Sequence, residues 1–266
     1  MGYVQTAAEV SYVKTAAEVS AAQDLLRNLK YESERVKVLF QTEPDFVRDV
    51  LPPCFAAAPD AGGMVTITRS RSDGADALDT RFLAASLFIR AMFRDAEGWY
   101  HLTMLLTGDM PITIGRELFG EAKKRADIHL DVSDNHASGY AERHGTRLIE
   151  VDLELGPDLG PRESIDNNLD LKCFLNSQAT DLEYDPIVTV APCRSQVRVF
   201  RVGTGTLNLR SSAEDPCGTV PVVAVDSISY EQLHSKYQHT DKYHLDDREG
   251  YLPYVIGRCY DFSNVR

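Results

Sequence analysis

Strand-like segments recur along most of this chain, with turn residues between them. Beyond residue 60, apolar residues either alternate with polar ones or form short continuous runs, as is typical of β-strands. Turn-forming pairs such as Gly156-Pro157 and Asp215-Pro216 separate the segments. Helical patterns are few and short. The sequence therefore predicts an α+β fold dominated by β-structure, with a closed antiparallel barrel or sandwich-like core and a few short helices.

The expected elements follow from these patterns. Leu25, Leu26 and Leu29 predict a helix over residues 20–32 with Ser20 as its N-cap. A second helix is expected at 43–51, and a turn with a short helix at 109–120. The acidic stretch 156–170 is predicted to be a surface loop. The expected strands are 36–40, 64–69, 82–93, 99–106, 126–132, 146–155, 171–175, 187–190, 196–202, 205–209, 220–228 and 252–260.

The N-terminus carries a short repeat. Residues 3–11 (YVQTAAEVS) and 12–20 (YVKTAAEVS) are almost identical. A period of nine fits neither a solenoid unit nor a heptad. The repeat is either a local duplication in a terminal arm or an arm that docks on a neighbouring subunit. We expect an arm at residues 1–20 and one domain at 21–266.

Charge and cysteine content limit the functional classes. The chain has 266 residues and a formal net charge of −12, which disfavours nucleic-acid binding because phosphate contacts need clustered Lys and Arg. Its five cysteines are far apart, as is typical of free thiols in a reducing compartment. No apolar run of about 18 residues is present, and the N-terminus does not resemble a signal peptide. We expect a cytoplasmic protein without a membrane partner.

Two adjacent lysines, Lys123 and Lys124, end the segment GRELFGEAKK at residues 115–124. A neighbouring ammonium and partial burial both favour the uncharged form of a lysine. An uncharged amine can attack a carbonyl and form a Schiff base. The segment follows two strongly apolar strands that are expected to wall a cavity. The alternative is a solvated pair on the surface.

The same segment resembles the GRE…KK signature of the acetoacetate decarboxylase family. Weaker likenesses are VLFQTE at 38–43, DFVRDVLPP at 45–53, residues 170–174 and CYDF at 259–262, so the resemblance covers roughly residues 36–262. It implies that Lys123 forms the Schiff base and that Lys124 is the neighbouring cation that helps to activate it. It also implies an oxo-acid substrate, no cofactor and a homo-oligomer.

The chain departs from the family around this lysine. The family carries glutamates in the strands before the motif, whereas residues 64–72 and 82–93 contain no acid, and Ala84 falls near one missing glutamate. Arg35 corresponds to an arginine that the family places before its first strand. Ala122 stands where the family often has proline. The resemblance therefore implies a conserved amine with altered proton-handling groups around it.

Other residues of the motif have two readings each. Arg116 either holds a substrate carboxylate or forms a structural ion pair with a neighbour such as Glu117. Glu121 is either an acid–base group or an exposed carboxylate. Tyr260 either lines the pocket or belongs to the core.

Three histidines recur every five residues near the C-terminus, at His234, His239 and His244. This spacing suits neither one face of a helix nor the HExxH pattern. We interpret the segment as a polar loop or fraying helix, and expect no metal.

These observations lead to one main functional hypothesis and two alternatives. The main one is a cofactor-independent Schiff-base lyase for a small oxo acid, decarboxylating a β-keto acid that is larger or less polar than acetoacetate. The second is an aldolase, dehydratase or cyclase of specialised metabolism that uses the same lysine. The third is a non-catalytic barrel that binds a small molecule.

Overall fold

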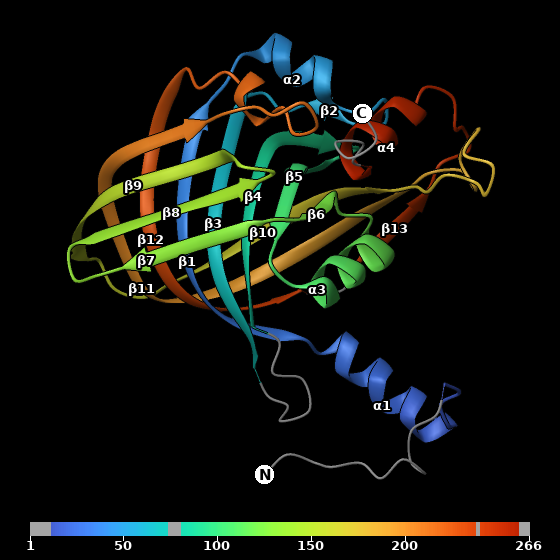
Figure 1. Ribbon diagram of the computed structural model, residues 1–266, viewed down its shortest axis with the longest axis horizontal. Coiled ribbons are helices and arrows are strands. Elements are labelled where there is room, and N and C mark those ends of the chain that lie inside the picture. Colours follow the sequence, from blue (N-terminus) through green and yellow to red (C-terminus); the bar gives the residue numbers. More distant parts are fainter. Residues whose placement is uncertain (1–11, 74–80, 238–239, 261–266) are drawn as a thin grey trace.

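A closed β-barrel forms the centre of the molecule (Figure 1). The structure, a computed structural model, describes residues 12–73, 81–237 and 240–260. The ring of seven strands closes because β10 pairs with both β5 and β11. Only the β10–β5 contact of the ring is parallel. In spatial order the strands are β10 (Arg162–Lys172), β5 (Ala96–Leu106), β4 (Arg81–Phe93), β3 (Gly62–Asp73), β1 (Lys30–Gln41), β12 (Ala224–Tyr237) and β11 (Ile187–Leu209).

A second sheet layer covers one side of the barrel. The long strand β11 belongs to both layers: residues 187–197 pair with β10, and 201–209 pair with β9. Figure 1 shows the outer strands crossing over β1, β3 and β4. The outer strands are β7 (Asp127–Val132), β8 (His136–Arg143) and β9 (Thr146–Asp158), and the short strands elsewhere are β2 (Ala56–Ala57), β6 (Lys123–Arg125) and β13 (Asp241–His244).

Strand alternation divides the side chains between a dry core and the barrel interior. Along β4, Ala85 and Leu87 point outward into the main apolar cluster, which they share with Val151 and Leu153 of β9. Their neighbours Ala84 and Ser86 point into the barrel, where they line a cavity. Successive residues of a strand face opposite sides, so the core lies between the two layers and the barrel interior remains available for a site.

Short helices cover the barrel ends. Val47 and Val255, from α2 and α4, are buried in a second apolar cluster at one end. Helix α1 has no buried residue and lies at the other end (Figure 1). Among the described residues, no helix is long and apolar enough to cross a membrane. The helices are α1 (Ala16–Arg27), α2 (Pro44–Val50), α3 (Asp109–Ile114), the π-helix η2 (Gly115–Phe119), the 3-10 helix η3 (Cys217–Thr219) and α4 (Leu252–Cys259).

The fold class predicted from the sequence is confirmed. Helix 43–51 is confirmed as α2, and the turn and short helix at 109–120 as α3 and η2. The strands predicted at 36–40, 64–69, 82–93, 99–106, 126–132 and 146–155 lie within or largely within β1, β3, β4, β5, β7 and β9.

The first helix begins earlier than predicted. Thr15, rather than Ser20, is its N-cap, and it forms a capping box with Glu18. The helix therefore starts inside the second copy of the repeat and crosses the expected boundary at residue 20. Residues 3–11 lie outside the described part of the chain. The division into arm and domain stays a prediction.

Four other element predictions are wrong. Residues 156–170 are not a loop, because β9 runs to Asp158 and β10 begins at Arg162. The three strands predicted between 187 and 209 are one strand, β11. The strand predicted at 171–175 ends at Lys172. Residues 252–260 form helix α4 rather than a strand, since proline in its first turn suits a helix start.

The prediction for the histidine segment is also wrong, and strands β2, β6, β8 and β13 were not predicted. His234 lies in β12 and His244 in β13, so they belong to neither a loop nor a fraying helix, whereas His239 lies outside the described residues. Strand β8 escaped prediction because its outward positions are polar and its apolar positions are mostly small alanines.

Candidate active site

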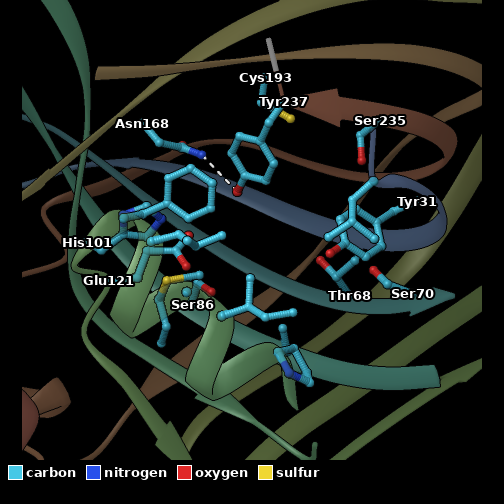
Figure 2. Close-up of a pocket in the computed structure, with 18 of the residues that line it drawn as sticks. Tyr31, Thr68, Ser70, Ser86, His101, Glu121, Asn168, Cys193, Ser235 and Tyr237 are labelled. Atoms are coloured by element: carbon cyan, nitrogen blue, oxygen red, sulfur yellow. Dashed lines mark hydrogen bonds between the residues drawn. The ribbon is translucent and has the colours of Figure 1, made fainter. Parts of the chain in front are cut away.

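The barrel encloses a cavity of about 1360 Å³ (Figure 2). All seven barrel strands contribute side chains to it, and Lys123 lies on its wall. Residues of α3, η2 and α1 also contact the cavity, among them Pro111, Leu118 and Leu26. A concave space inside a barrel is where a small-molecule site is expected.

Lys123 enters the cavity from the short strand β6, which pairs in parallel with β5 and places Lys123 opposite Met104. Its side chain is 11% exposed. The ammonium donates to the carbonyl oxygen of Pro111 at 3.2 Å and lies 2.6 Å from Oε2 of Glu121. Glu121 is itself 2% exposed, so the amine and the carboxylate form a buried ion pair on the cavity wall.

Two glycines make this arrangement fit. Gly120 ends the π-helix with φ of +84°, in the left-handed region that favours glycine, and turns the chain toward β6. Gly115 lies directly against the ion pair, and a Cβ there would overlap Glu121 Oε2 and Lys123 Nζ. Gly115 is thus explained by the space that the amine and the carboxylate need, and Gly120 by its left-handed conformation and its close approach to Lys172.

We expect Gly115→Ala to disturb the site more than the fold. The added methyl group must displace the Glu121 carboxylate, the Lys123 amine or both, and misplacing a reacting group by about 1 Å costs about 100-fold in rate. The rate at which borohydride fixes a carbonyl compound on Lys123 measures this. Gly257→Ala is the matched control, because nothing lies within 4 Å of its added Cβ. An unchanged rate for Gly115→Ala would contradict the packing argument.

A buried His–Asp pair lies beside the lysine and its carboxylate. Nδ1 of His101 lies 2.6 Å from Oδ1 of Asp170, and both side chains are 1% exposed. The ring of Phe88 packs on the imidazole, with the centroids 4.5 Å apart. Burial raises the pKa of Asp170, and the nearby Glu121 carboxylate raises it further, whereas His101 opposes the rise.

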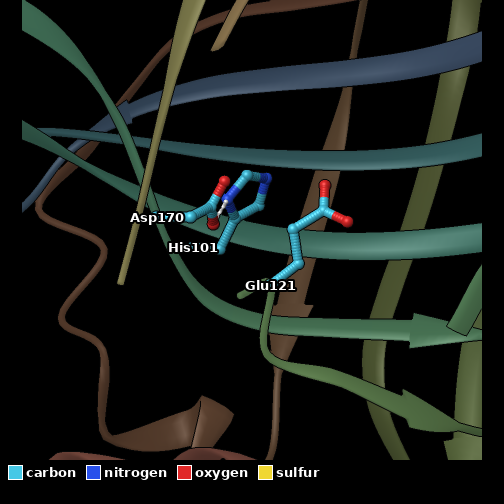
Figure 3. A group of neighbouring side chains, drawn as sticks. All are labelled: His101, Glu121 and Asp170. Carbon is cyan, nitrogen blue, oxygen red and sulfur yellow. Dashed lines mark hydrogen bonds and ion pairs between the residues drawn. The ribbon is translucent and has the colours of Figure 1, made fainter. Parts of the chain in front are cut away.

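His101, Glu121 and Asp170 each offer one potential ligand atom, and these atoms lie within 4.8 Å of one another (Figure 3). Such a set could hold a divalent cation. However, the Lys123 ammonium already supplies a positive charge 2.6 Å from Glu121. We therefore interpret the cluster as a proton-transfer site. His101 and Asp170 are absent from the site predicted from the sequence, because both strands carry several polar residues and nothing in the pattern singles these two out.

The side chains of Lys123 and Lys124 lie at different cavities, and the activating role of Lys124 stays a prediction. Successive strand residues point to opposite sides, and Lys124 points out of the barrel. Its ammonium lies 2.9 Å from Oδ1 of Asp215 and donates to the carbonyl of Glu214 at 3.0 Å. Nε of Arg143 lies 3.0 Å from Oδ2 of the same aspartate. Lys124 therefore belongs to a buried ionic network, next to a separate cavity of about 250 Å³.

Three further predicted site residues lie off the cavity. In η2, Gly115, Leu118 and Phe119 face the cavity, which turns Arg116 and Glu117 away from it. Tyr260 follows α4 and packs against the second apolar cluster, which supports its reading as a core residue. Arg116 and Glu117 do not face the cavity because the chain is helical there, and the residues that share a helix face are three or four apart.

The wall combines apolar side chains, among them Met64, Phe88 and Leu106, with many hydroxyl groups. The apolar wall that the sequence predicts is therefore present, but it is interrupted by polar side chains. Arg35 does reach the barrel interior, where its Nε donates to Glu231 at 2.8 Å. Burial raises the pKa of Tyr31 to about 12 and holds that of Tyr237 well above its usual value, so both phenols stay protonated and can donate hydrogen bonds. The hydroxyl-bearing side chains of the wall are Tyr31, Ser33, Thr66, Thr68, Ser70, Ser86, Ser195, Ser235, Tyr237 and Thr240.

Fold and site together define a class of protein: a closed β-barrel with a buried lysine–carboxylate pair facing an interior cavity. The sequence profile of the family described as acetoacetate decarboxylase (ADC) matches residues 14–245. The chain belongs to this family, whose members include enzymes.

Individual relatives are distant. The CLA biosynthesis isomerase of Lactiplantibacillus plantarum is 24% identical over 213 residues, which is 72% of this chain and 74% of the relative. The crystal structure of acetoacetate decarboxylase from Legionella pneumophila has a TM-score of 0.69 at 18% identity and covers 80% of this chain and 86% of its own. The enduracididine biosynthesis enzyme MppR, in complex with pyruvate, has a TM-score of 0.69 at 14% identity over 88% of this chain and 93% of its own. These likenesses show the fold.

Proposed function

We propose that this protein is a Schiff-base lyase in which Lys123 forms an iminium with the carbonyl of a β-keto acid, which then loses CO2. One observation carries the proposal: a nearly buried lysine amine lies 2.6 Å from a buried carboxylate on the wall of the barrel cavity. A buried ion pair of this kind can pass its proton from the ammonium to Glu121. That transfer leaves a neutral amine ready to attack.

The steps balance without a cofactor. The amine of Lys123 adds to the substrate carbonyl, and loss of water gives the iminium. The bond to the carboxylate then breaks, its electrons flow into the iminium, and CO2 leaves behind an enamine. Glu121 gives the proton that it took from the ammonium to the departing hydroxyl group, then takes up one proton from water and donates it to the enamine carbon. Water then hydrolyses the new iminium and frees the amine. Residues 64–72 and 82–93 contain no acidic residue that could act as the acid–base group. In this scheme Glu121 has that role.

The cavity supports a substrate larger than acetoacetate. At about 1360 Å³ it exceeds the range of about 300–1000 Å³ that is typical of small-molecule pockets. Its hydroxyl-rich wall also supplies many partners for oxygen atoms of a substrate. We therefore propose an extended oxo acid that carries apolar parts as well as further oxygen substituents.

A second function uses the same iminium without loss of CO2. The carboxylate of Glu121 is placed to remove a proton from the carbon next to the iminium, and the resulting enamine allows isomerisation, aldol addition or dehydration. The relationship to an isomerase of CLA biosynthesis is consistent with this route. A barrel that only binds its ligand would need no such amine–carboxylate contact.

Borohydride trapping tests the shared first step. The protein is incubated with acetoacetate or with pyruvate, reduced, and digested for peptide mass analysis. We expect the adduct on the peptide that carries Lys123, together with release of CO2 from acetoacetate. An adduct without CO2 from a panel of β-keto acids would move the assignment to the second function. Labelling of Lys123 no faster than of exposed lysines such as Lys14 would support the binding barrel instead.

A further inference from the structure

We infer that His101 and Asp170 form a proton relay that acts on the reaction through Glu121. The inference rests on the proposed function, since it concerns how the Lys123–Glu121 pair loses and regains a proton. Both are positioning residues in this scheme, because Glu121, not His101 or Asp170, faces the reacting atoms.

The geometry gives the relay its direction. Figure 3 shows the imidazole of His101 between the two carboxylates, with Asp170 on one side and Glu121 on the other. Nδ1 of His101 contacts Oδ1 of Asp170 at 2.6 Å, which leaves Nε2 for the side of Glu121. The potential ligand atoms of the three residues lie within 4.8 Å of one another, a separation that a direct contact or one water molecule can bridge.

The elements around the His101–Asp170 dyad fix its position and shield it from solvent. Asp170 and His101 lie on β10 and β5, which pair in the only parallel contact of the ring. Phe88 of β4 packs on the imidazole and restricts its rotation. At 1% exposure, the two side chains exchange protons with bulk water only through the cavity. Glu121 therefore has a buried proton acceptor, the imidazole of His101, close by on the side away from bulk water.

The relay step conserves protons and electrons. Glu121 takes a proton from the Lys123 ammonium, or from the carbon next to the iminium. It passes the proton to Nε2 of His101, and the Asp170 carboxylate stabilises the resulting imidazolium. Glu121 is then a carboxylate again and can accept another proton. The reverse path delivers a proton to the enamine. When the proton comes from carbon, the electrons of the broken C–H bond form the enamine C=C bond and the iminium C=N bond becomes single, and the reverse step restores both.

Several charged or titratable groups face this site. Glu121 and Lys123 lie on the cavity side, and Tyr237 of β12 lies near Glu121 and Asp170, where burial keeps the phenol protonated. Tyr100 of β5 and Arg258 of α4 also act on Asp170, the arginine favouring its ionised form. Near neutral pH, Asp170 is the group whose charge most directly stabilises a proton on His101.

Deuterium exchange into pyruvate separates the relay from Schiff-base formation. Trapping with borohydride reports the iminium alone, whereas exchange of the pyruvate methyl hydrogens in D2O requires proton removal from carbon. For Asp170→Asn we expect a trapping rate within about twofold of the wild type and an exchange rate lowered about 100-fold. The pH profile of exchange should change while that of trapping does not, because the carboxylate that contacts Nδ1 of His101 has been removed.

Two further variants make the result decisive. His101→Gln keeps a hydrogen-bond donor toward Asp170 but cannot carry a proton, so it should reproduce the loss of exchange even if Asp170→Asn does not fold. The exposed pair of His136 and Asp152, with Nε2 and Oδ2 3.1 Å apart, provides the control, and Asp152→Asn should leave both rates unchanged.

Each remaining outcome overturns the relay. If exchange is unchanged in both His101→Gln and Asp170→Asn, the dyad is structural only. If trapping and exchange fall together, with unchanged pH dependence, the dyad supports the fold or the amine rather than proton transfer. If the wild type shows no adduct on Lys123 at all, the proposed function fails first, and that result is visible before any dyad variant is compared.

Discussion

Lys123→Arg is expected to abolish borohydride trapping of acetoacetate or pyruvate and to lower turnover at least about 1000-fold. Arginine keeps the positive charge that Glu121 needs, but its guanidinium does not lose a proton in proteins and cannot form the iminium. The measurements are the mass of the reduced adduct and the rate of product formation. The unfolding temperature should change little, which separates lost chemistry from lost structure.

The companion variant Lys123→Ala removes the charge as well as the amine. It leaves the buried Glu121 carboxylate without its ion-pair partner, so it should lose stability in addition to activity. If Lys123→Arg instead retains measurable turnover with the same substrate, the reaction does not pass through a Schiff base on this residue. The proposed mechanism would then be wrong, whatever the stability of the variants.

Asp215→Ala is expected to cause the largest loss of stability, about 3–5 kcal/mol in the free energy of unfolding. Asp215 is 1% exposed and receives Lys124 on one carboxylate oxygen and Arg143 on the other. Removing it leaves two cations close together in a nearly dry environment. Urea unfolding followed by circular dichroism measures the change.

Lys124→Met is the matched control for this network. It removes one cation but leaves Arg143 paired with Asp215, so the loss should be only about 1–2 kcal/mol. The adduct on Lys123 should still form, because Lys124 points out of the barrel. A loss of trapping in this variant, without a loss of stability, would support the activating role that the sequence suggested for Lys124.

Part of the site could be predicted because its residues are close together in the sequence and form a recognisable motif. The segment GRELFGEAKK identified Lys123, and Glu121 was named as one of two readings, two residues before the lysine. His101 and Asp170 could not be predicted. They are 69 residues apart, and only the parallel contact between β5 and β10 brings them together. Each strand carries several polar residues, and the pattern does not show which of them will be buried against a partner on the other strand.

The sequence by itself determined the β-rich fold, most of its strands and the lysine, because alternation, turn residues and a compact motif act over a few neighbouring positions. The tertiary structure decided which way each side chain faces. In strand β6 the side chain of Lys123 points into the cavity, whereas that of Lys124 points to the opposite side and pairs with Asp215. The two residues differ in position by one, and successive strand residues face opposite sides. Ring closure decided the rest, since the cavity and its buried carboxylates exist only after β10 has joined β5 to β11.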